Sequence, residues 1–269
     1  MVVDHLRYDE VAFKASHNSI DRRASIVDQL SGTGGLVEPC RGLELDLVQS
    51  ENRFEWRIQH GARDHGPELR NVLDEIAGWA RSSDNWRHPV ITIHFDLKNA
   101  HLDHTDFAAV FDAMLVDVFG RQRIYTPGEV TGHHEDLVRA ARSGGWATFA
   151  RLRGKFVFCL SGNGGRKVAY ARHEPRDRVC FADYPGSRPA RRKGNRVFAN
   201  LFVAAAGYPA SLGRYRLTPG FVARGYNIVT RGLWDVSVSG GASFLSTDVL
   251  DKREYSLSGQ GFAPRFPVA

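Results

Sequence analysis

Short apolar runs alternate with longer amphipathic segments along almost the whole chain, and this alternation most limits what the chain can fold into. Residues 69–80 and 107–118 carry apolar side chains at helical spacing. Runs of β-type composition, which we predict as strands, lie at 11–15, 42–48, 57–60, 90–98, 155–160, 179–183, 197–203, 227–231 and 243–247. Strands that alternate with helices predict a parallel α/β fold, and a (β/α)₈ TIM-type barrel fits this length best. Because such a barrel has eight strands, one run is expected to be an extra strand or a loop.

A doubly wound parallel sheet is the competing architecture. Such a sheet usually carries a glycine-rich phosphate loop after its first strand. In this chain the first predicted strand runs instead into Ser-His-Asn-Ser-Ile-Asp at residues 16–21. No repeat, low-complexity tract or linker divides the 269 residues. We therefore expect one barrel domain over residues 1–269, with irregularities in its second half.

The chain carries a modest excess of positive charge. Thirty-six Lys and Arg residues against 30 Asp and Glu give a net charge of +6, which favours anionic partners. The basic segment 188–196 fits contact with an anionic membrane surface or an acidic ligand, or is simply a solvated loop. No recognition motif or aromatic platform supports nucleic-acid binding. The three cysteines form no disulfide or metal-ligand pattern.

The apolar stretches and the N-terminus bear on the compartment. The most apolar stretch, 201–206, is far shorter than the roughly 20 residues of a membrane-spanning helix. Charges begin at Asp4, and the apolar core of a secretion signal is absent from the first residues. A cytoplasmic protein and the mature form of a secreted protein both remain open, and we expect a monomer.

Two acidic side chains interrupt the second predicted strand. Alternation puts Leu43, Leu45 and Leu47 on one face and Glu44 with Asp46 on the other. Carboxylates inside a barrel are costly to desolvate unless a cation or hydrogen bonds compensate. A hard cation such as calcium, which takes carboxylate and amide oxygens, would compensate. The alternative is an exposed or salt-bridged pair.

The fourth predicted strand repeats this pattern. Its apolar positions alternate with Thr92, His94, Asp96 and Lys98. A strand covered by helices is apolar on its outer face, so the polar series is predicted to line the barrel interior or its mouth. Asp96 and Lys98 come at the C-terminal strand end, where barrel enzymes build their active sites. The competing interpretation is a buried ion pair that only sets the strand register.

Histidines follow two of the predicted strands. His17 and Asn18 follow the first strand, and His60 follows the third. Histidine is the side chain best suited to exchange protons near neutral pH. A lone histidine is more often structural or exposed, but the position of these two at strand ends beside the carboxylates favours a catalytic role.

Taken in order, these motifs resemble phosphatidylinositol-specific phospholipase C, above all the calcium-dependent single-domain form of bacteria. The likeness covers Phe13 to Asp248, and the family fold is a (β/α)₈-type barrel, in agreement with the periodicity. The segments that carry it are SHNSI, RGLELDLV, IQHG, VITIHFDLK, GGWATFARLRGKFVF, NIVTRG and GGASFLSTD.

The resemblance implies calcium-dependent cleavage of an inositol phospholipid. In this reaction the inositol 2-hydroxyl attacks phosphorus and gives a cyclic inositol phosphate and diacylglycerol. The implied calcium ligands, with Mg²⁺ as an alternative ion, are Asn18, Glu44, Asp46 and Asp96.

The resemblance also assigns roles to protein groups that act on the phosphodiester. His60 would protonate the leaving oxygen, and His17 would bind the developing charge. The base would be Glu44 or Asp96. Lys98 and Arg231 are candidate partners of the phosphate charge, or else counterions of the carboxylates.

The chain departs from the family pattern at two places. Asp96 stands where the family usually has glutamate, and its shorter arm would loosen the metal site or bind through water. The late family segment usually reads T-R-A-D, whereas Arg231 is followed here by Gly-Leu-Trp-Asp. This difference puts the contacts at the rim in question.

Two other functions stay open. A related barrel phosphodiesterase could act on glycerophosphodiesters or another lipid headgroup, but those enzymes typically read H-R-G where His17 is followed by Asn18 and Ser19. The second alternative hypothesis is a barrel that binds lipid headgroups without catalysis. It is disfavoured because both histidines and all four oxygen ligands are kept.

Overall fold

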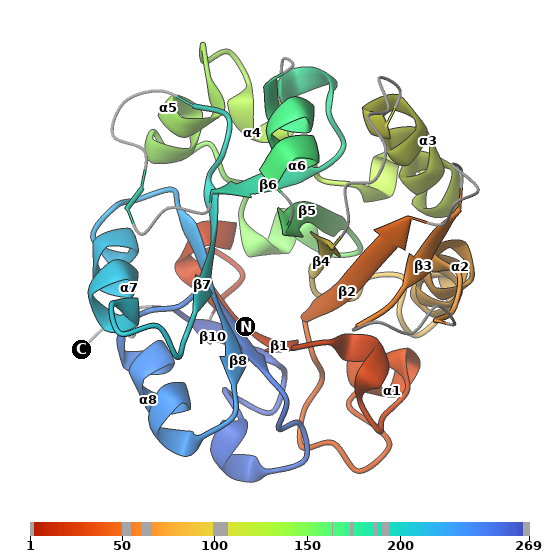
Figure 1. Ribbon diagram of the computed structural model, residues 1–269, viewed down its shortest axis with the longest axis vertical. Coiled ribbons are helices and arrows are strands. Elements are labelled where there is room, and N and C mark those ends of the chain that lie inside the picture. The colour runs from red at the N-terminus through yellow and green to blue at the C-terminus, as the bar shows by residue number, and fades with distance from the viewer. Residues whose placement is uncertain are drawn as a thin grey trace.

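Eight parallel strands close into a barrel in chain order, with a helix or loop after each (Figure 1). The computed structural model describes residues 3–49, 55–60, 66–98, 107–162, 164–172, 175–184, 188–189 and 194–265. The barrel strands are β1 (Val11–Ser16), β2 (Gly42–Gln49), β4 (Ile91–Leu97), β5 (Phe156–Gly162), β6 (Phe181–Tyr184), β7 (Phe198–Phe202), β8 (Val222–Ile228) and β9 (Phe244–Thr247). The predicted (β/α)₈ barrel is confirmed.

The barrel closes where β1 meets β2. One parallel pair, Ala15 with Gly42, joins these strands. A Cβ atom at position 42 would lie 2.7 Å from the Cβ of Ala15 and 2.9 Å from the ring of Phe244, well inside normal contact distance. Gly42 therefore allows the first two strands to approach closely enough to pair.

Two short antiparallel strands lie outside the barrel. β3 (Trp56–Ile58) pairs with β2, and β10 (Phe262–Pro264) pairs with β1. The predicted run 57–60 is thus the extra strand, while no run was predicted for β10.

One predicted strand is wrong in position. Residues 227–231 were expected to be extended, but β8 begins at Val222 and ends at Ile228. Asn227 adopts a left-handed conformation (φ 66°), and the Thr230 side chain accepts a hydrogen bond from the Leu233 amide as the N-cap of α8 (Arg231–Ser239). Residues 227–231, which have a β-type composition, therefore span the end of β8 and the start of α8.

Helices cover the outside of the barrel. Both predicted helices are confirmed, as α2 (Leu69–Arg81) and α3 (Phe107–Phe119). The others are short: α1 (Ile26–Ser31), α4 (Pro127–Thr131), α5 (Leu137–Arg142), α6 (Gly164–Arg172) and α7 (Tyr208–Arg216). In the described part of the chain no helix lies between β6 and β7, in line with the irregularity expected in the second half.

Two apolar layers hold the helices and strands together. The outward leucines of β2 join α2 and α3 in one cluster. Inside, Phe13 stacks on Phe244 with ring centroids 4.9 Å apart, and His94 meets Phe244 edge-on at 5.2 Å. These aromatic side chains pack the interior of the barrel, so a ligand is expected to bind at the C-terminal ends of the strands.

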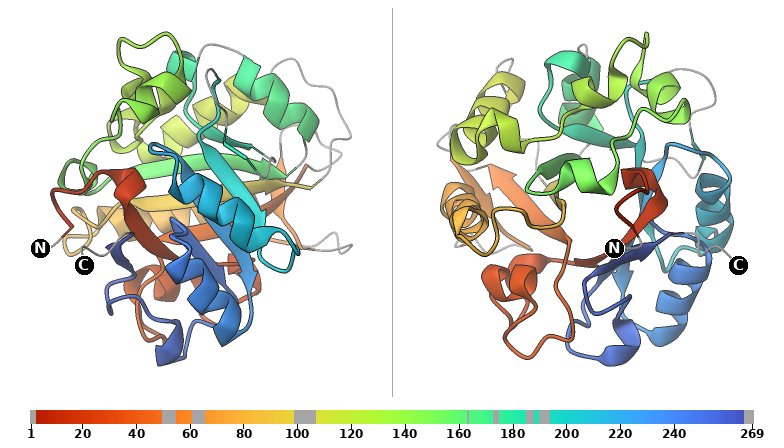
Figure 2. Two further views of the ribbon diagram at one scale, coloured as in Figure 1. Left: turned by 90° about the vertical axis from the view of Figure 1, so that its left-hand side faces the viewer. Right: turned by 180° about the vertical axis from the view of Figure 1, so that it is seen from behind.

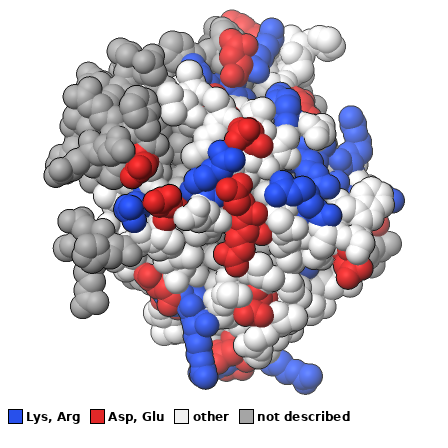
Figure 3. All heavy atoms as spheres, turned by 90° about the vertical axis from the view of Figure 1, so that its right-hand side faces the viewer, with Lys and Arg blue, Asp and Glu red and all other residues white. Residues whose placement is uncertain are grey.

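The two ends of the barrel differ in what they carry. β10 pairs with the start of β1. Both chain termini therefore lie at the barrel end opposite the C-terminal ends of the parallel strands (Figure 2). The face of the molecule that carries α2 shows interspersed positive and negative side chains (Figure 3). On α2, Arg70 pairs with Asp74 and with Asp117 of α3. Such a face is typical of a solvated surface.

The described residues contain no disulfide and no membrane-spanning helix. Cys40, Cys159 and Cys180 are all buried and free. None of the described helices has the length and apolar character that crossing a bilayer requires.

Candidate active site

Three carboxylates meet at the C-terminal end of β2 and β4. Parallel pairing sets Glu44 beside His94 and Asp46 beside Asp96, so alternation places all three acids on the inner face. Their nearest oxygens lie within 4.8 Å of one another. Next to them, Gly162 leaves room for Asp96, because a Cβ atom there would come within 1.9 Å of Asp96 Oδ1.

Glu44 is held as a carboxylate by a buried arginine. Arg224, only 1% exposed on β8, places its Nη2 atom 2.7 Å from Glu44 Oε2. Burial by itself raises the pKa of Glu44, but the charge and hydrogen bond of Arg224 outweigh burial and lower the pKa to about 2. Glu44 is therefore ionised at any physiological pH.

Asp46 is the least satisfied acid of the three. Both of its oxygens are buried and accept no hydrogen bond, although Lys98 Nζ lies 3.2 Å from Oδ1 without hydrogen-bond geometry. Burial raises the pKa of Asp46 to about 6, against the opposing charge of Lys98. The Lys98 ammonium also lies 2.6 Å from Asp96 Oδ2, so it neutralises part of the cluster.

His17 is oriented by a carboxylate from the far end of the chain. Its Nδ1 lies 2.9 Å from Oδ1 of Asp248, the residue that directly follows β9. Its Nε2 lies 3.7 Å from Glu44 Oε2. The His17 ring therefore lies between two carboxylates, Asp248 at Nδ1 and Glu44 at Nε2.

His60 lies beside Asn18, the residue whose backbone N–H contacts Glu44 of the acidic cluster. Its Nδ1 lies 3.2 Å from Asp21 Oδ2, and its Nε2 lies 3.4 Å from Asn18 Nδ2. The His60 side chain is 53% exposed, against 13% for His17. The more exposed histidine has access to a group that enters from solvent.

Asn18 reaches the cluster because its backbone is left-handed. The φ angle is 46°, a conformation that asparagine tolerates better than most residues. The backbone N–H of Asn18 donates to Glu44 Oε2 at 3.0 Å, and the residue is 8% exposed. The turn after β1 thus brings the backbone N–H of Asn18 to Glu44 and its side-chain amide to His60.

The donor set fits a calcium ion. The side chains of Glu44, Asp46 and Asp96 offer carboxylate oxygens within 4.8 Å of one another, the kind of ligand that Ca²⁺ prefers. The two buried Asp46 oxygens without hydrogen-bonding partners are the observation that calls for a cation.

Arg231 lies apart from the other candidates. It starts α8, pairs with Asp235 at 2.8 Å and donates to the carbonyl of Glu254 at 2.7 Å. Of the basic segment 188–196, residues 190–193 lie outside the described residues.

Four site residues were missed by the sequence analysis: Arg224, Asp248, Asp21 and Tyr226. Arg224 was missed because β8 was placed too late, although a charged residue inside the apolar run 221–229 is a usable signal. Asp248 and Asp21 carry no local signal, since their roles depend on contacts with His17 and His60.

A hollow of about 460 Å³ opens beside the cluster, between the ends of β5 to β8. Tyr226 and Phe202 form one wall, with ring centroids 5.5 Å apart. Lys167 and Asp183 also line the hollow and pair with each other, both 3% exposed. The hollow therefore has an aromatic wall, and the charges in its lining are paired with each other.

A family model described as Ca²⁺-dependent phosphoinositide phospholipase C matches residues 60–195, half of the chain. The matched segment contains His60, Asp96 and Lys98. No curated protein matches the chain significantly.

Solved structures share the fold at low identity. A calcium-dependent phosphoinositol-specific phospholipase C from Pseudomonas sp. is similar with a TM-score of 0.79 and 15% identity, over 98% of this chain and 96% of that one. The Ca²⁺-dependent enzyme from Streptomyces antibioticus gives 0.68 and 19%, over 91% and 94%. A glycerophosphodiester phosphodiesterase from Parabacteroides distasonis gives only 0.53 and 12%, over 89% and 94%.

Proposed function

The chain belongs to the family of Ca²⁺-dependent phosphoinositide phospholipases C, and we propose that it cleaves phosphatidylinositol between glycerol and phosphate. In the proposed reaction the inositol 2-hydroxyl attacks phosphorus, the glycerol oxygen leaves, and the products are cyclic inositol phosphate and diacylglycerol. The observation that carries the proposal is the acidic cluster of Glu44, Asp46 and Asp96, which His17 meets at Glu44 and to which Asn18 connects His60.

Calcium would be held by the cluster. The proposed ligands are Asn18, Glu44, Asp46 and Asp96. When bound, the ion neutralises phosphate charge and makes a hydroxyl more acidic. The family description supports calcium, and nothing supports the magnesium alternative.

The protein's own groups would handle the protons. His60, exposed and held at Nδ1 by Asp21, is the proposed acid for the leaving oxygen. His17, held by Asp248 and close to Glu44, is proposed to stabilise the charge that develops on the phosphate.

Asp96 is the proposed base for the 2-hydroxyl. Glu44 is the other candidate, but its low pKa and its bond to Arg224 make it a weak proton acceptor. Lys98, bound to Asp96, would meet the phosphate charge. Arg231 stays a proposed rim contact, which requires it to leave Asp235.

The substrate is expected to be reached at a lipid surface. Phe202 is the last residue of β7 and Val229 follows β8, and the two are 42% and 45% exposed. No charged residue occurs from 201 to 213. Apolar side chains at the mouth, together with the net positive charge, fit transient contact with an anionic membrane.

The test is turnover of phosphatidylinositol vesicles with calcium and with excess chelator, followed by ³¹P NMR of the soluble product. We expect a cyclic inositol phosphate only with calcium. Release of glycerophosphate from glycerophosphodiesters would favour the second function, and binding without hydrolysis in either condition would favour the non-catalytic barrel.

A further inference from the structure

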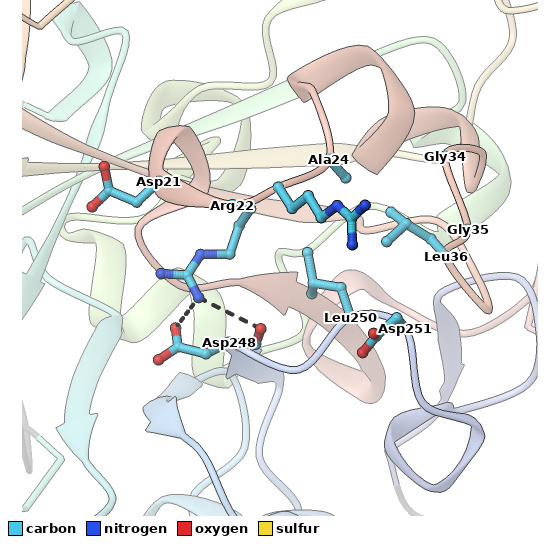
Figure 4. Close-up of a pocket in the computed structure, with 10 residues that line it drawn as sticks. Asp21, Arg22, Ala24, Gly34, Gly35, Leu36, Asp248, Leu250 and Asp251 are labelled. Carbon is cyan, nitrogen blue, oxygen red and sulfur yellow. Dashed lines mark hydrogen bonds and ion pairs between the residues drawn. The ribbon is translucent and has the colours of Figure 1, made fainter.

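Arg22 connects the two chain segments that build one half of the site. Its Nη1 lies 3.0 Å from Asp248 Oδ1 and donates to the Asp248 carbonyl at 3.5 Å (Figure 4). Its Nε donates to the Asn18 carbonyl at 3.3 Å. The side chain is 19% exposed. One guanidinium thus bridges the loop after β1 and the loop after β9.

A single carboxylate oxygen receives both Arg22 and His17. Asp248 Oδ1 accepts from His17 Nδ1 at 2.9 Å and pairs with Arg22 at 3.0 Å. The Asp248 side chain is 28% exposed, so without the arginine the bond to His17 would have to hold it alone against rotation toward solvent. Arg22 therefore restricts the carboxylate that orients the imidazole.

The same guanidinium supports the turn at Asn18. Asn18 has a left-handed backbone, which costs free energy unless neighbouring contacts maintain it. The bond from Arg22 to the Asn18 carbonyl is one such contact.

We propose that Arg22 is a positioning residue of the reaction: it fixes Asp248 against His17 and holds the turn that carries Asn18, without touching the substrate. This inference rests on the proposed function. It concerns a residue that precedes the segment matched by the family model.

A groove beside Arg22 makes the proposal testable by chemical rescue. The groove has a volume of about 450 Å³, is open to solvent and is lined by Arg22, Asp248, Leu36 and Leu250, among others (Figure 4). Truncation of Arg22 would leave space there for a small guanidinium ion. Arg23 lines the same groove and is exposed, and it forms no ion pair with another described residue, which makes it the matched control.

The kinetic experiment compares Arg22→Ala, Arg22→Lys and Arg23→Ala with the unaltered protein on phosphatidylinositol. For Arg22→Ala we expect kcat to fall about 10- to 100-fold with KM nearly unchanged. Added methylguanidinium should restore part of the loss, Arg22→Lys should be intermediate, and Arg23→Ala should stay near the unaltered rate. A kcat within about twofold, or a raised KM with kcat unchanged, would overturn the proposal.

A second measurement does not depend on turnover. Side-chain ¹⁵N NMR of His17 should show an Nδ1 that keeps its proton and its hydrogen bond to Asp248 in the unaltered protein and in Arg23→Ala, and an Nδ1 signal shifted by loss of that bond in Arg22→Ala. Unchanged His17 signals in a folded Arg22→Ala variant would refute the positioning role. If the unaltered protein fails to cleave phosphatidylinositol, the proposed function is wrong, and the NMR comparison still decides the role of Arg22.

Discussion

Asp46 and Asp96 lie directly opposite each other on the neighbouring parallel strands β2 and β4. Lys98 follows Asp96 by two residues, so it lies on the same side and its ammonium reaches both acids, at 3.2 Å and 2.6 Å. The strand register itself thus concentrates negative charge at one point of the mouth and supplies only a partial counterion. The electrostatics of this pair lead to the first prediction.

Asp46→Asn should stabilise the calcium-free protein at neutral pH. Burial raises the pKa of Asp46 from 3.8 to about 6. Between these values the folded state binds more protons than the unfolded state, so this group makes stability fall as pH rises. Above pH 6 the ionised carboxylate costs about 2–3 kcal/mol, which the amide avoids. Chemical unfolding in excess chelator from pH 4 to 8 measures the difference.

Calcium provides the control for this variant. The unaltered protein should gain thermal stability when calcium is added, because the ion binds only the folded state, whereas Asp46→Asn should gain much less. A variant less stable than the parent in chelator at pH 7 would contradict the repulsion on which the prediction depends.

Arg224→Met should destabilise the protein strongly, because it leaves Glu44 as an unpaired buried charge. Removing one partner of a buried ion pair typically costs about 3–5 kcal/mol. The double variant Glu44→Gln/Arg224→Met should recover most of that loss. Urea unfolding of both single variants and the double variant gives the coupling energy, and simple additivity of the two losses would show that the pair does not interact.

His60→Ala should affect substrates according to their leaving group. The proposed acid matters most when the leaving oxygen is a poor leaving group, as in a lipid, and little when it is an activated aryl oxygen. We expect a loss of at least about 100-fold for phosphatidylinositol, and a much smaller loss for an aryl phosphodiester of inositol. Equal losses for the two substrates would remove His60 from the acid role.

Gly42→Ala should weaken closure of the barrel. The added methyl group would lie 2.7 Å from Ala15 and 2.9 Å from Phe244, and overpacking of this kind costs about 1–3 kcal/mol. Gly78→Ala is the matched control, because a Cβ atom there meets nothing within 4 Å and the residue lies inside α2. Alanine at 78 should stabilise by up to about 1 kcal/mol. Thermal unfolding compares the two, and a Gly42 variant as stable as the Gly78 variant would be evidence against the tight contact.

Local pattern was enough to predict the barrel and the acidic strands. The alternation around Glu44 and Asp46 has a period of two, and the spacing in residues 69–80 is helical. Both patterns report which side of a strand or helix is buried, which neighbouring residues alone determine. For the same reason Asp96 and Lys98 could be assigned to the mouth before any contact was known.

The partners of the histidines depended on the tertiary structure. His17 binds Asp248 across 231 residues of chain, and Glu44 binds Arg224 from a strand placed too late by composition. No sequence spacing encodes such pairs, because closure of the barrel decides which strand ends become neighbours. The acidic cluster and the two histidines at the mouth are thus evident in the sequence, while their charged partners, their orientation and their pKa shifts arise only when the first and last strands meet.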